Sequence, residues 1–358
     1  MTALPKQQSA LVGLPDGSLG LSHEAPVPHL EDDMVIVRNV ACSINPVDSK
    51  LLGDLVTPGA IAGMDFAGYV VAIGAKAKTP TKLKIGDRVC GTVQGMHSLT
   101  PAIGAFSQFV GADGIATLKV PDGVTFEQAA SLGCIVGTIG LAMRSVQVPG
   151  SPTQPAGKAI PVLVYGGSTS TGGLAIQLLK LSGFKPITTC SPRNFDLAKS
   201  YGAEEVFDYH PASAAESIKS YTKNSLKYVI DCVSEPETMR FCYKCIGRSG
   251  GKYVALEPYP EGSDTRATVT PSWVLGPELL GKKIAWAGPL ARDENPEIRD
   301  WTLEWFRTVQ GLLDEGKLKY HPLRVLDGGF DAILQGFELL QKKQVSAQKL
   351  IVRIPQPN

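Results

Sequence analysis

The sequence lacks the cysteine clusters and paired histidines that mark many metal sites. Its seven cysteines are scattered along 358 residues, and its five histidines show no HExxH or other paired spacing. An odd, scattered set of cysteines fits reduced thiols in a cytoplasmic protein better than a disulfide framework. The net charge is only +1, which argues against nucleic acid or an anionic membrane as the main partner. No basic segment followed by an apolar core opens the chain, and the most apolar stretch, from Gly59 to Ala75, carries Asp65 and four glycines, so we expect neither a secretory signal nor a membrane span.

One cysteine pair has the spacing of a redox motif. Cys242 and Cys245 form a C-x-x-C sequence, but a redox pair sits at the start of a helix, just after a strand. Here the pair falls inside a predicted helix, so we interpret both as packing thiols. With 43% hydrophobic and 19% charged residues, the chain is typical of a globular protein long enough for two domains.

The most informative stretch runs from Ile160 to Asn194, with the sequence IPVLVYGGSTSTGGLAIQLLKLSGFKPITTCSPRN. It predicts an apolar strand, a turn of small residues, an amphipathic helix and a second strand, which together open a dinucleotide-binding fold. Small residues let the backbone approach a pyrophosphate, and a helix N-terminus offers free N–H groups to it. The match to G-x-G-x-x-G is imperfect, because hydroxyl residues stand where glycines are usual: Ser168, Thr169, Ser170 and Thr171. An ordinary strand-to-helix turn is the alternative.

The residues after the second strand bear on the choice of cofactor. An NAD site usually places an acid there to bind the ribose 2′-hydroxyl. This chain continues with Ser191, Pro192, Arg193 and Asn194, and the first carboxylate is Asp196. A hydroxyl, a guanidinium and an amide suit a 2′-phosphate, so we predict NADPH; a solvated arginine near a helix start is the alternative.

The rest of the chain reads as a β module followed by an α/β domain. Residues from Gln8 to Gly111 predict short strands broken by glycine and proline. After Asn194, helices alternate with strands that end near residues 209, 233 and 257. Ligands collect beyond the carboxyl ends of such strands, so Tyr209, Leu256 and Glu257 are candidate cofactor contacts, with plain packing as the alternative for each.

Several motifs in the β module resemble those of the medium-chain dehydrogenase/reductase superfamily. They are ACSINPVDSKLLG from Ala41, GMDFAGYVVAIG from Gly63, KIGDRVCG from Lys84 and GAFSQFV from Gly104. The resemblance implies an α/β fold in which a GroES-like β-rich catalytic domain accompanies a Rossmann doubly wound parallel sheet. It assigns residues 1–130, completed by about 300–358, to the first domain and residues 131–299 to the second.

The chain departs from the zinc-dependent alcohol dehydrogenases of that superfamily at three points. Asn45 stands at the position of a zinc-binding cysteine, and Met64 and Asp65 replace the His and Glu of a G-H-E motif. Four closely spaced cysteines for a structural zinc are also lacking. We therefore expect no metal. Reduction of a double bond conjugated to a carbonyl needs no Lewis acid, whereas polarising an alcohol or simple ketone without one is difficult.

Longer segments resemble the fungal trans-acting enoyl reductases that partner iterative highly reducing polyketide synthases. They are YGGSTST, TTCSPRNFDLAKSYGAEEVFDY, YTKNSLKYVIDC and LGPELLG. The resemblance implies an NADPH-dependent, zinc-free enoyl reductase of secondary metabolism. Its substrate would be an α,β-unsaturated acyl thioester on the acyl carrier domain of a polyketide synthase, alone or as a hybrid with a peptide synthetase. A free-standing quinone or enone reductase, and a non-catalytic accessory subunit of a synthase, remain alternatives.

The same resemblance implies which residues form the site. The nicotinamide side would be lined by Val47, Asp48, Ser49 and Lys50, with Val345 and Ser346 nearby, while Ser168 to Thr171 would hold the pyrophosphate and Ser191 to Asn194 the 2′-phosphate. The acyl tunnel would be lined by Ser131, Leu132, Gly133, Cys134, Ile135, Val136, Gly137, Thr138, Gly276, Pro277, Glu278, Leu279 and Leu280.

Two of these residues are candidate catalytic groups. Stabilising the developing oxyanion requires a positioned charge or hydrogen-bond donor. Lys50 is the candidate for the charge, and Thr138, expected near a helix N-terminus, for a hydrogen bond to the thioester oxygen. A solvated lysine and a packed or capping threonine are the alternatives. No dedicated acid stands out, so a water is left as the proton source. Gly288, Pro289 and Pro296 would interrupt the edge strand that pairs two subunits in many relatives, so we expect a monomer.

Overall fold

The chain forms two compact units in a computed structural model that describes residues 4–260, 262–263 and 266–357. The β-rich unit comprises residues 1–137 and 277–358, and the α/β unit comprises residues 138–276. The sequence motifs placed the boundaries at 130/131 and 299/300 instead. Residues 131–137 and 277–299 therefore belong to the β-rich unit, not to the dinucleotide-binding half.

The packing of helix α8 (Pro296–Asp314) explains this difference. The Trp305 indole donates a hydrogen bond to the Val136 carbonyl at 2.9 Å, and the Thr302 hydroxyl donates to the Leu279 carbonyl at 2.7 Å. Both side chains are buried. Such contacts join segments distant in the chain, and neither local periodicity nor a motif reveals them.

A seven-stranded sheet forms the centre of the β-rich unit, in the order β14-β15-β3-β4-β5-β7 with β6 paired to β3. Its core includes Val35, Val37, Phe66, Val89 and Val110, all at most 1% exposed. A separate hairpin pairs β1 with β2. The strands are β1 (Gln7–Gly13), β2 (Leu19–Pro26), β3 (Met34–Ile44), β4 (Asp65–Ile73), β5 (Arg88–Thr92), β6 (Phe109–Asp113), β7 (Thr117–Lys119), β14 (Leu323–Leu326) and β15 (Lys349–Arg353).

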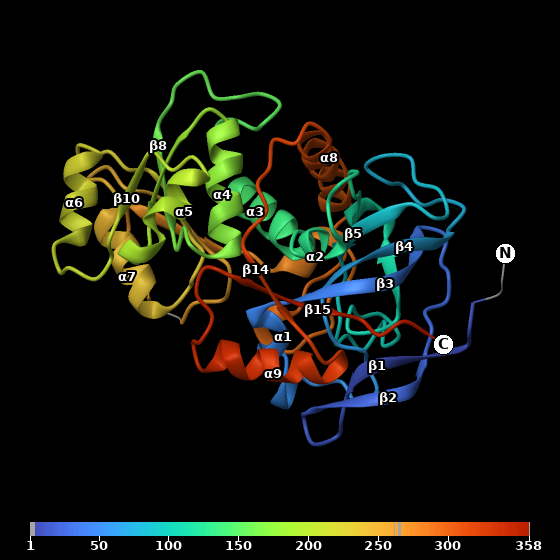
Figure 1. Cartoon of the computed structure of the whole chain (residues 1–358). Coiled ribbons are helices and arrows are strands. Elements are labelled where there is room, and N and C mark those ends of the chain that lie inside the picture. The colour runs from blue at the N-terminus through green and yellow to red at the C-terminus, as the bar shows by residue number, and fades with distance from the viewer. Residues whose placement is uncertain (1–3, 261, 264–265, 358) are drawn as a thin grey trace. The chain divides into compact units, whose positions relative to one another are not determined.

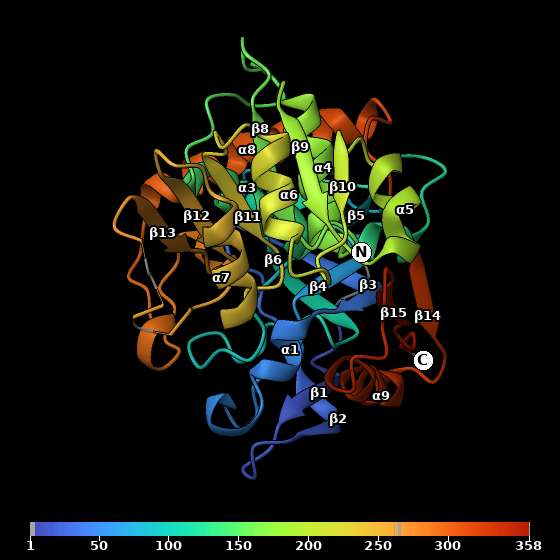
Figure 2. The ribbon, with the colours of Figure 1, turned by 90° about the vertical axis from the view of Figure 1, so that its left-hand side faces the viewer.

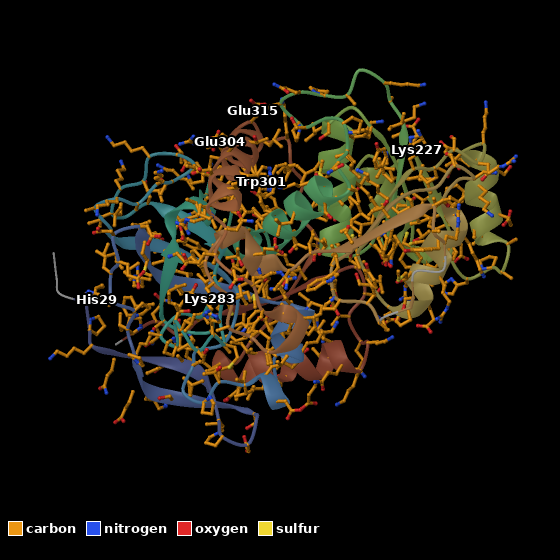
Figure 3. The ribbon with its side chains drawn as sticks, turned by 180° about the vertical axis from the view of Figure 1, so that it is seen from behind. His29, Lys227, Lys283, Trp301, Glu304 and Glu315 are labelled. Carbon is orange, nitrogen blue, oxygen red and sulfur yellow. The ribbon has the colours of Figure 1, made fainter. Side chains whose placement is uncertain are left out.

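Local capping and periodicity account for the helices of this unit. Thr125 and Gln128 form a capping box at the start of α2, and the Asn295 side chain caps α8 by accepting a hydrogen bond from the Ile298 amide. Figure 3 shows Trp301 and Glu304 on α8, whose opposite side is buried. The helical segments are α1 (Pro46–Lys50), α2 (Phe126–Ala130), α3 (Gly133–Ser145, continuing past residue 137), α8, α9 (Phe330–Gln341), and the 3₁₀ turns η1 (Gly53–Leu55), η2 (Gly114–Ala116), η4 (Gly276–Leu280) and η5 (Gly288–Leu290).

The α/β unit is a six-stranded parallel sheet in the order β10-β9-β8-β11-β12-β13, the strand order of a Rossmann fold. Helices α4 and α5 lie on one face, and α6 and α7 lie on the other (Figures 1 and 2). The elements are β8 (Pro161–Tyr165), α4 (Ser170–Leu181), β9 (Lys185–Thr189), η3 (Pro192–Asn194), α5 (Phe195–Ser200), β10 (Glu205–Phe207), α6 (Ala214–Tyr221), β11 (Tyr228–Asp231), α7 (Pro236–Cys245), β12 (Gly251–Ala255) and β13 (Val269–Trp273).

One edge of this sheet is formed by a strand that is not among those predicted from the sequence. The segment around Ile284 forms only an isolated bridge with Arg292 and is not part of the sheet. The edge strand is β13, which the hydrophobic pattern did not reveal. It contains Pro271, opposite Tyr253 of β12, and proline is tolerated at a sheet edge because it has no N–H to donate to a further strand.

Cys242 and Cys245 are buried packing residues, as the sequence indicates. All seven cysteines are free, and Cys242 and Cys245 lie within α7, where burial raises the pKa of Cys242 and raises that of Cys245 to about 12. One helical stretch, Phe126–Ser145, is apolar and long enough to cross a membrane, but 78% of its apolar 18-residue segment is buried inside the fold. It therefore has the burial of a core helix.

Candidate functional site

The turn between β8 and α4 is shaped by close backbone contacts that only glycine permits. Gly166 has φ 86°, and a Cβ on Gly172 would lie 2.2 Å from the Gly166 carbonyl oxygen. The Thr169 hydroxyl donates to that carbonyl at 2.8 Å and accepts a hydrogen bond from the Gly172 amide at 2.9 Å, capping α4. The turn thus combines the tight glycine geometry and the helix N-terminus that anion binding requires.

Hydroxyl groups border this turn in place of the usual glycines. Ser168, Thr169, Ser170 and Thr171 are all half-buried. Thr169 is committed to the turn itself, whereas the first N–H groups of α4 have no intrahelical acceptor. The turn therefore fits a pyrophosphate, with the backbone and neighbouring hydroxyls as donors.

The end of β9 brings Ser191, a predicted 2′-phosphate residue, next to Tyr209, a predicted cofactor contact. The Ser191 hydroxyl and the Tyr209 hydroxyl lie 3.2 Å apart, although 18 positions separate them in the chain. Arg193 is exposed on η3. Tyr209 is 37% exposed, and its ring stacks on His210 with centroids 4.2 Å apart.

Asp208, the acid nearest to Tyr209 in the chain, already interacts with a histidine. Hydrogen bonds from the His210 backbone and ring lower the pKa of Asp208, so this carboxylate is ionised and engaged with the histidine. A hydroxyl, a guanidinium and an amide at the end of β9 remain a suitable set for an anionic group.

A buried aspartate organises the loop at the end of β11, and sequence reasoning did not single it out. Asp231 is 0% exposed and accepts hydrogen bonds from the amides of Val233 and Ser234, both at 3.0 Å, and from the Thr238 and Tyr253 hydroxyls. Burial raises the pKa of Asp231. Its position at the carboxyl end of a predicted strand was the available signal.

This loop also fixes the residues after β12. The Ser234 hydroxyl accepts a hydrogen bond from the Leu256 amide at 2.7 Å. Leu256 and Glu257, both half-buried, follow directly after β12. They therefore lie at the same edge of the sheet as the β8–α4 turn, as the sequence predicts.

In the β-rich unit, helix α1 carries the predicted nicotinamide-side residues. Val47 and Ser49 are half-buried, Lys50 is exposed at the last position of the helix, and Asp48 is buried. One carboxylate oxygen of Asp48, Oδ2, accepts a hydrogen bond from the Asn45 amide at 2.7 Å. Burial raises the pKa of Asp48 to about 7. The Asp48 carboxylate thus contributes to the buried interior, whereas Lys50 has access to solvent.

Most residues predicted to line the acyl tunnel, those at 131–137 and 277–280, lie within the β-rich unit, whereas Thr138 and Gly276 belong to the α/β unit. A Cβ on Gly137 would lie 2.2 Å from Leu279 Cδ2, so the first turns of α3 pack directly on η4. Along residues 131–138 every side chain except Cys134 is buried, as are Pro277, Leu279 and Leu280 in η4. Thr138 is 9% exposed and lies in the second turn of α3, so it does not cap the helix.

Val345 and Ser346 lie in the loop between α9 and β15. Val345 is half-buried and Ser346 exposed. The loop leads directly into Lys349, a buried lysine that sequence reasoning missed. The only signal was a single charged residue at the start of an apolar strand.

Asn45 and Asp65, at the sequence positions of two zinc ligands in the zinc-dependent enzymes, hydrogen-bond to each other. Asn45 Nδ2 donates to Asp65 Oδ2 at 2.9 Å, and Lys349 Nζ lies 3.8 Å from the same oxygen. Across residues 4–260, 262–263 and 266–357, no three His, Cys, Asp or Glu side chains are grouped so that they could hold a metal ion.

Comparison with protein families gives two matches. The alcohol dehydrogenase GroES-like domain matches residues 31–122, and the zinc-binding dehydrogenase domain matches residues 171–275. Each match falls within one of the two structural units.

Comparison with individual proteins gives relatives along the full chain. The chain is 60% identical to the trans-enoyl reductase FSL5 of Gibberella zeae, with 99% of each chain covered. It is 48% identical to the trans-enoyl reductase buaC of Petromyces alliaceus, with 97% of each covered. Two solved structures share the fold of this chain. One is an alcohol dehydrogenase superfamily protein from Novosphingobium aromaticivorans, with a TM-score of 0.76 and 21% identity, covering 98% of this chain and 100% of that one. The other is the CurK enoyl reductase, with a TM-score of 0.73 and 17% identity, covering 98% of this chain and 100% of that one.

Proposed function

The chain belongs to the trans-enoyl reductases, within the medium-chain dehydrogenase/reductase superfamily, and from this premise we propose its reaction. It uses NADPH to reduce the α,β-double bond of an enoyl thioester that is carried on the acyl carrier domain of a partner polyketide synthase. The synthase stands alone or is a hybrid with a peptide synthetase. The enzyme acts in trans, as a monomer in the cytoplasm, in fungal secondary metabolism.

The observation that carries the proposal is similarity along the whole chain. Identity of 46–60% extends over 96–99% of the chain to proteins that are all named trans-enoyl reductases. Identity confined to one unit would support only a shared cofactor or a shared fold. The similarity here spans both units, so it also covers the segments assigned to the thioester.

The α/β unit supports the proposed cofactor. Ser168 to Thr171 and the N-terminus of α4 hold the pyrophosphate, and Ser191, Pro192, Arg193 and Asn194 bind the 2′-phosphate. Tyr209 stacks on the adenine, and Leu256 and Glu257 line the cofactor further along the sheet edge. This assignment rests on the glycine-shaped β8–α4 turn and on the absence of an acid between Thr189 and Asp196.

The groups that we assign to the substrate are Lys50, in the β-rich unit, and Thr138, the first residue of the α/β unit. When bound, the reduced nicotinamide supplies the hydride that the substrate β-carbon accepts. Val47, Asp48 and Ser49 lie on the nicotinamide side, together with Val345 and Ser346.

Two residues stabilise the charge that develops on the thioester oxygen. The Lys50 ammonium is held on a helix that begins with a capping box, and it provides positive charge. The Thr138 hydroxyl provides a hydrogen bond to the oxygen. A preorganised donor of this kind accounts for about 10²–10³ in kcat. The proton for the α-carbon comes from water.

The residues proposed for the acyl chain are mostly apolar. Ser131 to Thr138 and Gly276 to Leu280 form its wall, in keeping with their burial and with the direct packing of Gly137 on Leu279. A wall of this composition suits a hydrocarbon chain, because burying apolar surface is favourable by about 25 cal/mol per Å².

The test offers NADPH together with enoyl chains, each as a carrier-linked thioester and as a free small enone. We expect the reduced-nicotinamide absorbance to fall fastest with the carrier-linked chain. Equal or faster turnover of free enones and quinones would instead assign a free-standing reductase. Binding of NADPH without oxidation by any carrier-linked chain would assign a non-catalytic accessory subunit.

A further inference from the structure

Asp65 joins three separate elements of the β-rich unit through one buried carboxylate. It is 0% exposed on β4. Its Oδ2 accepts hydrogen bonds from the Ser43 hydroxyl at 2.7 Å and from Asn45 Nδ2 at 2.9 Å, and its Oδ1 accepts one from the Cys134 amide at 2.5 Å. Asn45 is the residue just before α1, and Cys134 is the second residue of α3. A single carboxylate therefore holds the starts of both helices.

The approach of α3 to this carboxylate is close. A Cβ on Gly133 would lie 2.7 Å from Asp65 Oδ1 and 2.1 Å from the Gly91 carbonyl oxygen. Only glycine lets the helix start reach this position, and a carboxylate there also interacts favourably with the helix dipole. The position of α3 thus depends on Asp65 as well as on apolar packing.

Lys349 supplies the counter-charge from the other end of the chain. Its side chain is 6% exposed, its Nζ lies 3.8 Å from Asp65 Oδ2, and the ammonium donates a hydrogen bond to Asn45 Oδ1. A second buried carboxylate, Asp48, bonds through Oδ2 to the Asn45 amide, and its Oδ1 has no hydrogen-bond partner. The ammonium therefore lies near Asp65 and interacts electrostatically with a second buried acid, Asp48.

A buried ion pair is a poor stabilising device, because desolvation of both ions offsets most of their attraction. Apolar residues of similar volume often stabilise a core as well or better. Removing one partner, by contrast, leaves a buried charge uncompensated. A pair with such energetics fits a role in fixing geometry better than a role in stability alone.

We propose that Asp65 and Lys349 are positioning residues for the enoyl reduction, holding the starts of α1 and α3 in the arrangement that the reaction requires. Through Asn45 they orient the helix that carries Lys50, and through Cys134 they orient the helix that carries Thr138. This inference rests on the proposed function, because that function assigns the two helices to the nicotinamide side and the thioester. Neither residue touches the reacting atoms.

The main test is Lys349→Met, with Asp65→Asn as a second variant that keeps the side-chain size while removing the charge. Both should lower kcat at least tenfold, because displacing a positioned group by about 1 Å costs up to about 10²-fold. The dissociation constant for NADPH should stay within about twofold, since the phosphate-binding residues belong to the α/β unit. Asp65→Asn keeps the test decisive if Lys349→Met does not fold.

The matched control is Lys119→Met. Lys119 pairs with the buried Asp87 at 3.1 Å, in the same unit, and neither residue hydrogen-bonds to the 45–50 or 133–138 segments. It should leave kcat within about twofold of the wild type. If the control lowers kcat as much as the two variants do, or if the variants weaken NADPH binding and leave kcat unchanged, the positioning role is refuted.

A readout without turnover separates this inference from the proposed function. Amide hydrogen exchange should accelerate in the peptides covering residues 45–50 and 133–138 of both variants, and stay unchanged there in Lys119→Met. An unchanged rate of amide exchange in those peptides would overturn the inference, whichever substrate the enzyme reduces. A wild-type protein that oxidises no NADPH with any enoyl thioester would overturn the proposed function while the exchange result still stood.

Discussion

Replacing Arg193 with glutamine should change the cofactor preference of the protein more than its overall fold. Arg193 is exposed on η3, at the end of β9, and no carboxylate stands between Thr189 and Asp196. Arg193→Gln removes the positive charge but keeps a polar side chain of similar reach. NADPH binding should weaken, and NADH binding should stay the same, because NADH has no 2′-phosphate.

The magnitude follows from the exposure of the site. A hydrogen bond to a charged group contributes about 1.5–3 kcal/mol, which corresponds to roughly tenfold to a hundredfold in affinity. Arg193 is exposed to solvent, and exposed ion pairs are weakened by water and salt. We therefore expect the lower end, about a tenfold rise in the NADPH dissociation constant, and a smaller effect in high salt.

The assay is a titration followed by the fluorescence of the bound reduced nicotinamide, with NADPH and NADH measured on the same preparations. Lys199→Gln is the matched control, because Lys199 is an exposed cation on the neighbouring helix α5 and should change neither affinity by more than about twofold. Equal weakening of both cofactors, or no change for NADPH, would refute the assignment of Arg193 to the 2′-phosphate.

Three further predictions follow from the site. Lys50→Met should lower kcat by about 10²-fold with little change in NADPH affinity. Steady-state kinetics at saturating cofactor measure this, and a kcat equal to that of the wild type would contradict it. Gly172→Ala should abolish NADPH binding, because its Cβ would lie 2.2 Å from the Gly166 carbonyl oxygen. The control Gly157→Ala should bind NADPH normally, because its Cβ would have no atom within 4 Å, and calorimetric titration of both variants with NADPH tests the difference. The pKa of Asp48 rises from 3.8 to about 7 on folding, so between those values the folded state binds more protons and stability falls as pH rises. Asp48→Asn should remove that fall in stability, which is on the order of 3–4 kcal/mol. Denaturant unfolding measured from pH 4 to 8 tests this, and the same dependence of stability on pH in the variant and the wild type would contradict the pKa shift.

Local sequence patterns were sufficient where neighbouring residues decide the structure. The strand, glycine turn and helix from Pro161 to Leu181 follow from apolar periodicity and from the backbone freedom of Gly166. Strands β10, β11 and β12 were predicted to within a few residues for the same reason. The helical setting of Cys242 and Cys245 was also evident from sequence, and it identified them as packing thiols.

The tertiary structure decided what depends on residues far apart in the chain. Lys349 reaches Asn45 across 304 positions, and nothing near either residue predicts that contact. The boundary near residue 277 arises from the packing of α8 on η4, and the edge strand β13 from its pairing with β12. Sequence alone determined the elements and the chemistry at their ends, because both depend on local backbone preference. The buried charges and unit boundaries required the folded chain, because solvent exclusion and long-range packing exist only there.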